Sequence, residues 1–290
     1  MSEVSLGIIG GSGLYDIDGF EALQEVALGT PFGAPSDAYI VGRLNGVRCV
    51  FLPRHGRGHR HTPTEVNYRA NIWGLKKLGC RNVLSVSAVG SLREEIEPGH
   101  MVCVDQFIDR TRGRVESFFG GGIVAHVQFG DPIEEALRQV VLASAREVGV
   151  IVHDGGTYVC IEGPTFSTRA ESELYRSFGA SVVGMTNVPE ARLAREAELA
   201  YATLALSTDY DCWHTGHDEV SVESVIAIIK QNVANAKAVI KTVCQRMAEI
   251  GPVEWPSHSA LAGGVAIMTA RDQIPNDRKE ALGLLIDPYL

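Results

Sequence analysis

Short apolar runs that end in glycine or polar residues alternate with helical segments along most of the chain, and this alternation constrains the fold most strongly. Each run has the length of a buried strand, and the segments between the runs begin at capping residues or proline. Strands that alternate with helices form a mainly parallel sheet with helices packed on its faces. The sequence therefore predicts an α/β fold. The predicted strands cover 6–9, 47–52, 82–86, 158–161, 181–183 and 201–206.

Capping signals give the helix boundaries. Thr62-Pro63-Thr64-Glu65 is a capping box with proline in the first turn, and Asp131-Pro132-Ile133-Glu134 repeats the pattern. Ser167 is the expected N-cap of a third helix, which Gly179 ends. The predicted helices cover 63–78, 132–148, 168–178, a segment that starts at 189, and a long amphipathic segment at 221–250.

The chain reads as one domain followed by a tail. Its 290 residues exceed the usual length of one domain, but α/β folds commonly run this long as a single unit. We expect residues 1–250 to form this domain. Residues 251–290 contain several prolines and glycines and are expected to pack on the domain or on a neighbouring subunit.

Composition excludes several classes of function. A formal net charge of −9 argues against coating nucleic acid or binding an anionic membrane. We find neither a signal-peptide pattern nor an apolar run long enough to span a bilayer, so we expect a cytoplasmic protein. The six cysteines include no CxxC pair, which argues against a zinc site and a disulfide framework, although individual pairing stays open.

Polar residues follow five of the predicted strands. In open α/β sheets ligands bind beyond the carboxyl ends of the strands, so these residues are the first candidates for a site. Backbone N–H groups exposed by glycine, hydroxyl donors and an arginine able to bind two oxygens at once together suit a phosphate ion. These features belong to Ser12 with its glycines, Arg54 with His55, Ser87 with Ala88, and Thr186. The other residues at strand ends are Met185 and the pair Asp209 and Asp211.

These motifs also have other interpretations. The GGSG loop around Ser12 lacks the G-x-G-x-x-G pattern of a dinucleotide site, but a purely structural turn stays open. The basic run 54–61 has no interleaved aromatic residues for stacking bases, and a solvated loop is its plain alternative. His55, His59 and His61 lack acidic or cysteine partners, so we predict no metal.

Asp209 and Asp211 are two residues apart, so both carboxylates face the same side of an extended segment. Two acids on one face suit a nitrogen heterocycle, one addressing a ring nitrogen and one an exocyclic amine. A turn or helix cap near Thr215 is the alternative.

Long motifs over nearly the whole chain resemble those of 5′-methylthioadenosine phosphorylases, within the trimeric purine nucleoside phosphorylase family. The resemblance implies a single-domain three-layer fold with a central twisted, mixed but mainly parallel sheet flanked by helices. It also implies a homotrimer or a larger assembly such as a hexamer, with active sites near subunit interfaces. The motifs are GIIGGSG, RHGRGHRHTPTEVNYRANIWGLKKLGC, SAVGSLREEIEPG, VDQFIDRT, EGPTFSTRAES, GMTNVPEA and STDYDCW.

The resemblance also implies roles for individual residues. Phosphate would bind to Ser12, Arg54, His55, Ser87, Ala88 and Thr186. Met185 would lie near the ribose and Phe166 against the purine, and the base would be read by Ser167 and the segment Asp209-Tyr210-Asp211. The methylthio group would be contacted by Val222, Val225 and Ile226, with His126 from a neighbouring subunit. The alternative for the three apolar residues is that they simply pack in the hydrophobic core, as one stripe of an amphipathic helix usually does.

Two departures from the family pattern bear on these roles. Ser12 and Ser87 stand where threonine is frequent, which keeps the hydroxyl and loses a methyl group. Phosphorylases of 6-oxopurines carry asparagine in the region of Asp209, whereas an acid there suits a 6-aminopurine.

The reaction that the resemblance implies is phosphorolysis of S-methyl-5′-thioadenosine to adenine and 5-methylthio-α-D-ribose 1-phosphate, a pentosyl transfer in methylthioadenosine salvage. Inorganic phosphate is the co-substrate, no cofactor is expected, and Asp209 would donate a proton to N7 of the leaving base. Methylthioinosine or other purine nucleosides are alternative substrates, and some cleavage of adenosine is expected. A non-catalytic nucleoside-binding protein and a hydrolase are rivals of other classes, and a calcium-type hydrolase site is not evident.

Overall fold

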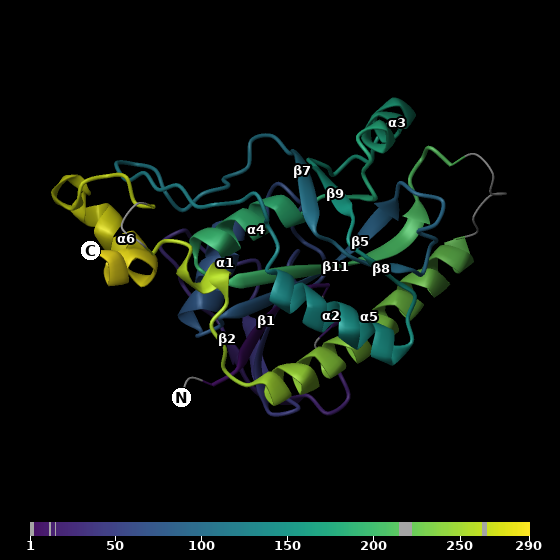
Figure 1. Ribbon diagram of the computed structural model, residues 1–290, viewed down its shortest axis with the longest axis horizontal. Coiled ribbons are helices and arrows are strands. Elements are labelled where there is room, and N and C mark those ends of the chain that lie inside the picture. The colour runs from purple at the N-terminus through teal and green to yellow at the C-terminus, as the bar shows by residue number, and fades with distance from the viewer. Residues whose placement is uncertain (1–2, 12, 15, 215–221, 263–265) are drawn as a thin grey trace.

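A mixed β-sheet lies at the centre of the molecule (Figure 1). The computed structural model describes residues 3–11, 13–14, 16–214, 222–262 and 266–290, apart from the side chains of 222–226. The described strands are β1 (Ser5–Gly10), β2 (Glu21–Val26), β3 (Tyr39–Leu44), β4 (Val47–Pro53), β5 (Asn82–Ser91), β6 (Met101–Cys103), β7 (Gln106–Arg110), β8 (Val152–Asp154), β9 (Thr157–Ile161), β10 (Val182–Gly184) and β11 (Ala200–Tyr210).

The middle of the sheet is parallel. Strand β1 pairs in parallel with β4 and β5, and β5 pairs in parallel with β11. At one edge β3 pairs antiparallel with β4, and β2 pairs antiparallel with β3. At the other end, β10 pairs antiparallel with β5 and parallel with β9, which is followed by β7. The predicted mixed, mainly parallel sheet is confirmed.

Helices cover both faces of the sheet. Figure 1 shows α1 and α4 on one side of β11 and α2 and α5 on the other, while α3 projects from the end of the molecule. Strand β1 is buried along its whole length, as a parallel strand covered on both faces must be. The predicted three-layer α/β fold is therefore confirmed. The helices are α1 (Tyr68–Lys77), α2 (Glu135–Val148), α3 (Arg169–Ser177), α4 (Asn187–Glu196), α5 (Val222–Ile250) and α6 (Asn276–Ile286).

Two predicted helix starts are wrong, because one capping box is followed only by a turn and the other does not form. The backbone N–H of Thr62 does bind the Glu65 carboxylate at 3.0 Å, but α1 begins only after Asn67, whose Oδ1 accepts from the N–H of Ala70 at 3.2 Å. Glu134 does not close a capping box before α2. Its carboxylate accepts from the backbone N–H and the hydroxyl of Ser257, at 3.1 and 2.7 Å.

The starts of α3 and α4 also differ from the prediction, and both differences affect the site. Thr168, not Ser167, caps α3 and forms a capping box with Glu171, so the Ser167 side chain is not used as a cap. Helix α4 begins at Asn187, before Pro189, and Thr186 is its N-cap.

The C-terminal segment contacts the domain and a long loop between β7 and α2. The Glu198 carboxylate accepts from the backbone N–H of Leu261 at 2.9 Å and from the Tyr289 hydroxyl at 2.7 Å. In α6, Arg278 donates to the carbonyl of Phe118 in the long loop at 2.9 Å. Figure 1 shows α6 and this loop together, away from the sheet. The division of the chain at residue 250 remains a prediction.

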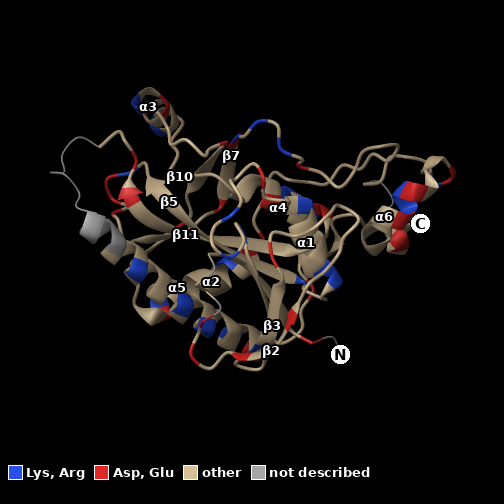
Figure 2. Ribbon diagram, turned by 180° about the vertical axis from the view of Figure 1, so that it is seen from behind, with Lys and Arg blue, Asp and Glu red and all other residues tan. Residues whose placement is uncertain are grey.

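Lysine and arginine residues recur along α5 (Figure 2). Two of them pair with aspartates in the segment after β1: Lys237 lies 3.4 Å from Asp16, and Lys241 lies 3.1 Å from Asp18. Exposed pairs of this kind contribute at most about 1 kcal/mol each. None of the described helices is both long enough and apolar enough to cross a membrane.

Candidate active site

A cavity of about 530 Å³ lies where the carboxyl ends of several strands meet. Its volume is typical of a site for a small organic ligand. The convergence expected from the sequence is confirmed for most of the candidate residues. Those that line the cavity are Arg54, His55, Ser87, Ala88, Phe166, Ser167, Met185, Thr186, Asp209 and Asp211.

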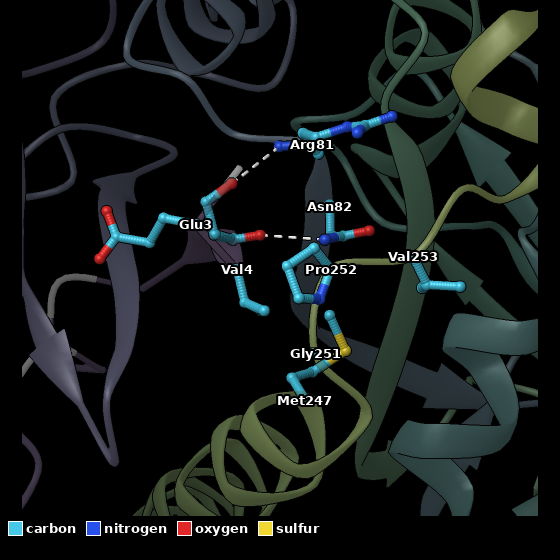
Figure 3. Close-up of a pocket in the computed structure, with 9 residues that line it drawn as sticks. Glu3, Val4, Arg81, Asn82, Met247, Gly251, Pro252 and Val253 are labelled. Carbon is cyan, nitrogen blue, oxygen red and sulfur yellow. Dashed lines mark hydrogen bonds between the residues drawn. The ribbon is translucent and has the colours of Figure 1, made fainter. Parts of the chain in front are cut away.

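A second cavity lies beside the start of β1 and the end of α5 (Figure 3). It is lined by Val4, Asn82, Pro252 and their neighbours, and its volume is about 10 Å³. This space is enough for about one water molecule. The larger cavity is therefore the candidate active site.

A gap in the pairing of β5 opens the sheet toward the large cavity. On one side β5 pairs with β1 as far as Ser85 and with β10 only from Gly90 onward. Between them, residues 86–89 have no partner strand on that side among the strands described. Ser87 and Ala88 lie in this gap, and the backbone groups here that point away from β11 have no strand to pair with and are open to a ligand. The predicted end of this strand at Val86 is wrong, because β5 continues to Ser91 beside β11.

Three polar atoms in the cavity wall are buried without a hydrogen-bond partner in the described part of the chain. They are the hydroxyl oxygens of Ser87 and Ser167 and the Oδ2 atom of Asp211. Buried polar atoms are nearly always hydrogen-bonded in native proteins, because leaving one unpaired costs about 1–3 kcal/mol. All three were candidate residues in the sequence. Their free atoms indicate places where a ligand completes the site.

The N-terminus of α4 lies at the cavity. Its N-cap Thr186 is buried and lines the cavity, and its side chain makes no capping hydrogen bond to the helix. The first N–H groups of a helix and its dipole together favour an anion. This end of the cavity therefore has the features of a phosphate site.

Arg54 is bound more fully than the sequence suggested. Its Nε and Nη2 atoms donate to the two oxygens of Glu190 at 2.8 and 3.0 Å, Nη2 also donates to Ser85 Oγ at 2.6 Å, and Nη1 donates to the carbonyl of Val86 at 3.0 Å. The expectation that Arg54 binds two ligand oxygens through its fork is wrong, because a buried guanidinium needs a counter-charge. Of its five N–H groups, one on Nη1 has no partner among the described residues.

His55 is held as a neutral ring. Its Nδ1 donates to the carbonyl of His61 at 2.8 Å, and the ring stacks on His59 with centroids 4.4 Å apart. Burial, followed by the charge of Arg54, lowers the pKa of His55 to about 4. Because Nδ1 carries the proton, Nε2 of the neutral ring is an acceptor.

Asp209 and Asp211 both line the cavity, while Tyr210 between them points away from it. The Tyr210 hydroxyl donates to the carbonyl of Glu94 at 2.9 Å, so the structure does not bring this candidate into the cavity. Burial raises the pKa of Asp209; a hydrogen bond from Thr208 opposes the shift and repulsion by Asp211 adds to it. A raised pKa favours the protonated carboxylic acid, which is the form that donates a proton.

Met185 and Phe166 are among the apolar residues of the cavity wall. Gly163 has a φ of +64°, a conformation that favours glycine, and a Cβ atom there would lie 2.5 Å from Met185 Sδ, so a larger residue would displace the Met185 side chain. Phe166 lines the cavity with 80% of its surface exposed. An aromatic face at an open cavity mouth suits a flat ring system.

Several candidates cannot be placed in the cavity. Ser12 and the side chains of Val222, Val225 and Ile226 lie outside the described residues. His126 is exposed and is not among the lining residues; its backbone N–H donates to the carbonyl of Ala266 at 2.9 Å.

Some lining residues were not expected from the sequence. Ile229 and Val233 on α5 line the cavity, and helical spacing continues the stripe of Val222 and Ile226 through them, so the signal was present. Glu190, the partner of Arg54, looked like an ordinary acid in the first turn of a helix. Its role depends on a contact across 136 positions of sequence, which no local pattern indicates.

Comparison with known proteins agrees with this geometry. The family model of the phosphorylase superfamily matches residues 5–245. An S-methyl-5′-thioadenosine phosphorylase of Geobacter sulfurreducens is 58% identical over 99% of this chain and all of its own length. A Synechocystis protein of the same name is 54% identical, over 100% of this chain and 89% of its own.

Solved structures give the same result. A methylthioadenosine phosphorylase from an Antarctic soil metagenomic library has a TM-score of 0.93 and 46% identity, covering 98% of this chain and 99% of its own. A mutant adenosine/methylthioadenosine phosphorylase from Schistosoma mansoni, solved with methylthioadenosine, has a TM-score of 0.80 and 39% identity, covering 85% of this chain and 92% of its own.

Proposed function

Since the chain belongs to the phosphorylase superfamily, we propose that the large cavity is where it carries out the phosphorolysis of S-methyl-5′-thioadenosine. In this reaction inorganic phosphate displaces adenine and leaves 5-methylthio-α-D-ribose 1-phosphate. The observation that carries the assignment to this cavity is that its two ends carry different polar groups. One end has the features of an anion site, and the other has two carboxyl groups beside an exposed aromatic ring.

The phosphate end comprises the gap in β5, the start of α4 and Arg54. Phosphate accepts from the hydroxyls of Ser87 and Thr186, the backbone at Ala88 and the remaining Nη1 N–H of Arg54. His55 accepts from an oxygen of phosphate that carries a proton, which its neutral ring supports. Ser12, which the family resemblance adds to this group, lies outside the described residues.

The base end comprises Asp209, Asp211, Ser167 and Phe166. Phe166 packs against the purine, and the free atoms of Ser167 and Asp211 hydrogen-bond to the base. Asp209 in its protonated form donates to N7, which its raised pKa supports. Met185, between the two ends, contacts the ribose.

The two ends act together in the transition state. As the glycosidic bond breaks, the sugar becomes cation-like and the purine becomes anionic. Phosphate places negative charge beside the sugar, and Asp209 neutralises the purine at N7. Fixing phosphate and nucleoside in one cavity also makes their encounter nearly unimolecular. This chemistry requires no metal and no organic cofactor.

The 5′ end of the substrate faces α5. The family resemblance assigns the methylthio group to Val222, Val225 and Ile226, whose side chains lie outside the described residues. Ile229 and Val233 continue the same helical stripe and line the cavity, which supports the assignment. His126 reaches this end from a neighbouring subunit.

The assembly is a homotrimer or a larger multiple of one. Supporting this, Val124 and Met268 are 49% and 63% exposed where the loop of His126 meets the C-terminal segment. Exposed apolar side chains that lie together favour contact with another protein surface. The protein works in the cytoplasm, which its unpaired cysteines support, because reducing compartments keep thiols free.

Phosphorus NMR of the reaction products tests the proposal. Purified protein with methylthioadenosine and inorganic phosphate is expected to convert the phosphate signal into that of a sugar 1-phosphate. Free methylthioribose with an unchanged phosphate signal would identify a hydrolase and contradict the assigned phosphate end.

A further inference from the structure

Arg114 is a buried arginine that belongs to no candidate group described above. It lies in the long loop between β7 and α2, and its side chain is 1% exposed. Its guanidinium donates to the carbonyls of Met185 and Glu162, each at 2.5 Å, and to the carbonyl of Ile161 at 3.3 Å. Arg114 therefore joins the ends of β9 and β10 where both strands meet the cavity.

The same side chain reaches a third segment of the wall. Its Nη1 donates to the hydroxyl of Tyr68 at 3.3 Å, and that hydroxyl donates to the carbonyl of Pro63 at 2.8 Å. The guanidinium carbon also lies 5.7 Å from the centre of the Tyr68 ring. Since Pro63, Ile161 and Met185 all line the cavity, one arginine holds three separate parts of its wall in register.

Glu162 fixes the orientation of this guanidinium. Its Oε1 accepts from Arg114 Nε at 3.2 Å, and the carboxylate also accepts from the Thr64 hydroxyl and the backbone N–H of Arg112. Burial acts to raise the pKa of Glu162, but the hydrogen bonds from Thr64 and Arg112 and the charge of Arg114 lower it overall. The carboxylate is thus ionised, and the pair locks the fork onto the carbonyls.

We propose that Arg114 is the positioning residue for the nucleoside half of the cavity. The inference rests on the proposed function. Arg114 contacts the wall that carries Met185, Ile161 and Pro63, and it has no hydrogen bond to Arg54 or Ser87 at the phosphate end. It acts through the backbone of these residues and does not touch the substrate. The guanidinium spreads its donors over three nitrogens of a planar fork, whereas lysine has all its donors on one nitrogen and cannot reach the same separate carbonyls, so lysine is not an equivalent residue here.

Arg114→Lys tests the proposal in the full-length protein. We expect kcat/KM for methylthioadenosine to fall on the order of 10- to 100-fold, the usual cost of a misplaced wall. The KM for phosphate is expected to change much less, and adenine binding measured by calorimetry is expected to weaken in parallel with the nucleoside. Arg112→Lys is the matched control, because that side chain lies exposed on the same loop, and it should behave as wild type.

Glu162→Gln distinguishes the effect of the Arg114 hydrogen bonds to the carbonyls from the effect of its ion pair with Glu162. It removes the charge on Glu162 but leaves the three carbonyls, so its effect on adenine binding should be smaller than that of Arg114→Lys. Wild-type adenine binding by Arg114→Lys would overturn the proposal. So would an equal rise in the two KM values with a lower unfolding temperature, which would indicate a merely structural role. If the wild type cleaves no nucleoside, the proposed function fails, whereas adenine binding still tests Arg114.

Discussion

The buried pair of Arg54 and Glu190 yields a prediction in which stability and phosphate binding separate. Both side chains are nearly inaccessible, at 4% and 1% exposure, and two hydrogen bonds join them. Arg54→Met leaves the Glu190 carboxylate buried without its counter-charge, which costs about 3–5 kcal/mol of unfolding free energy. Arg54→Met combined with Glu190→Gln removes both charges. In the wild type the Tyr201 hydroxyl donates to Glu190 at 2.9 Å, and the amide oxygen of the new glutamine can still accept this hydrogen bond. Most of the lost stability should therefore return.

Phosphate binding should not return with it. Both variants lack the one Arg54 N–H left for phosphate, and a charge-assisted hydrogen bond contributes about 1.5–3 kcal/mol, or roughly 10- to 150-fold in affinity. Urea unfolding at matched protein concentration measures the stability, and KM for phosphate at saturating nucleoside measures the affinity. Equal stability of the single and double variants would refute the description of a buried ion pair. A wild-type KM for phosphate in both would remove Arg54 from the phosphate site.

Substitutions at Asp209, Glu196 and Gly184 test other parts of the account. Asp209→Asn should lower kcat for methylthioadenosine on the order of 100- to 10,000-fold with little change in KM for phosphate, because it removes the proton donor. Since the protonated acid is the active form, the wild-type rate should fall as pH rises through the Asp209 pKa. Stopped-assay pH profiles of both proteins would show whether the variant loses this dependence. Burial raises the pKa of Glu196 from 4.5 to about 7, so the folded protein binds a proton that the unfolded chain has lost. The unfolding free energy should therefore fall by up to about 3 kcal/mol as pH rises between those values. Urea titration at several pH values measures this slope, which should be absent in Glu196→Gln. Gly184→Ala places a Cβ atom 2.0 Å from the Tyr158 hydroxyl, so we expect the unfolding free energy to fall by roughly 1–3 kcal/mol. Nucleoside binding should weaken because the adjacent Met185 is displaced. An unchanged melting temperature would contradict the close packing.

The central strands and the layer order could be predicted because their signals are local. An apolar run such as Leu6 to Ile9 that ends in glycine has few structures open to it, and alternation with helices then requires parallel strands covered on both faces. Strand β2 could not be found in this way. Its residues are almost all exposed, so it has no apolar run, and only pairing with β3 makes it a strand.

Helix starts were less predictable because capping residues have a choice of partners. Glu134 carries the pattern of a capping box, but Ser257 in the C-terminal segment supplies the donors that its carboxylate accepts. The site shows the same limit. Polar strand ends indicated where Ser87, Thr186 and Asp209 lie, whereas the contacts of Arg54 with Glu190 and of Arg114 with three backbone carbonyls join residues far apart in the sequence.

The central claim is that one cavity binds phosphate at one end and a 6-aminopurine nucleoside at the other and joins them chemically. The most direct test is the rate of adenine release from methylthioadenosine by the purified protein, with and without inorganic phosphate, beside the rates for methylthioinosine and adenosine. The account predicts release that depends on phosphate and is fastest with methylthioadenosine. Release at the same rate without phosphate, or a preference for methylthioinosine, would contradict it.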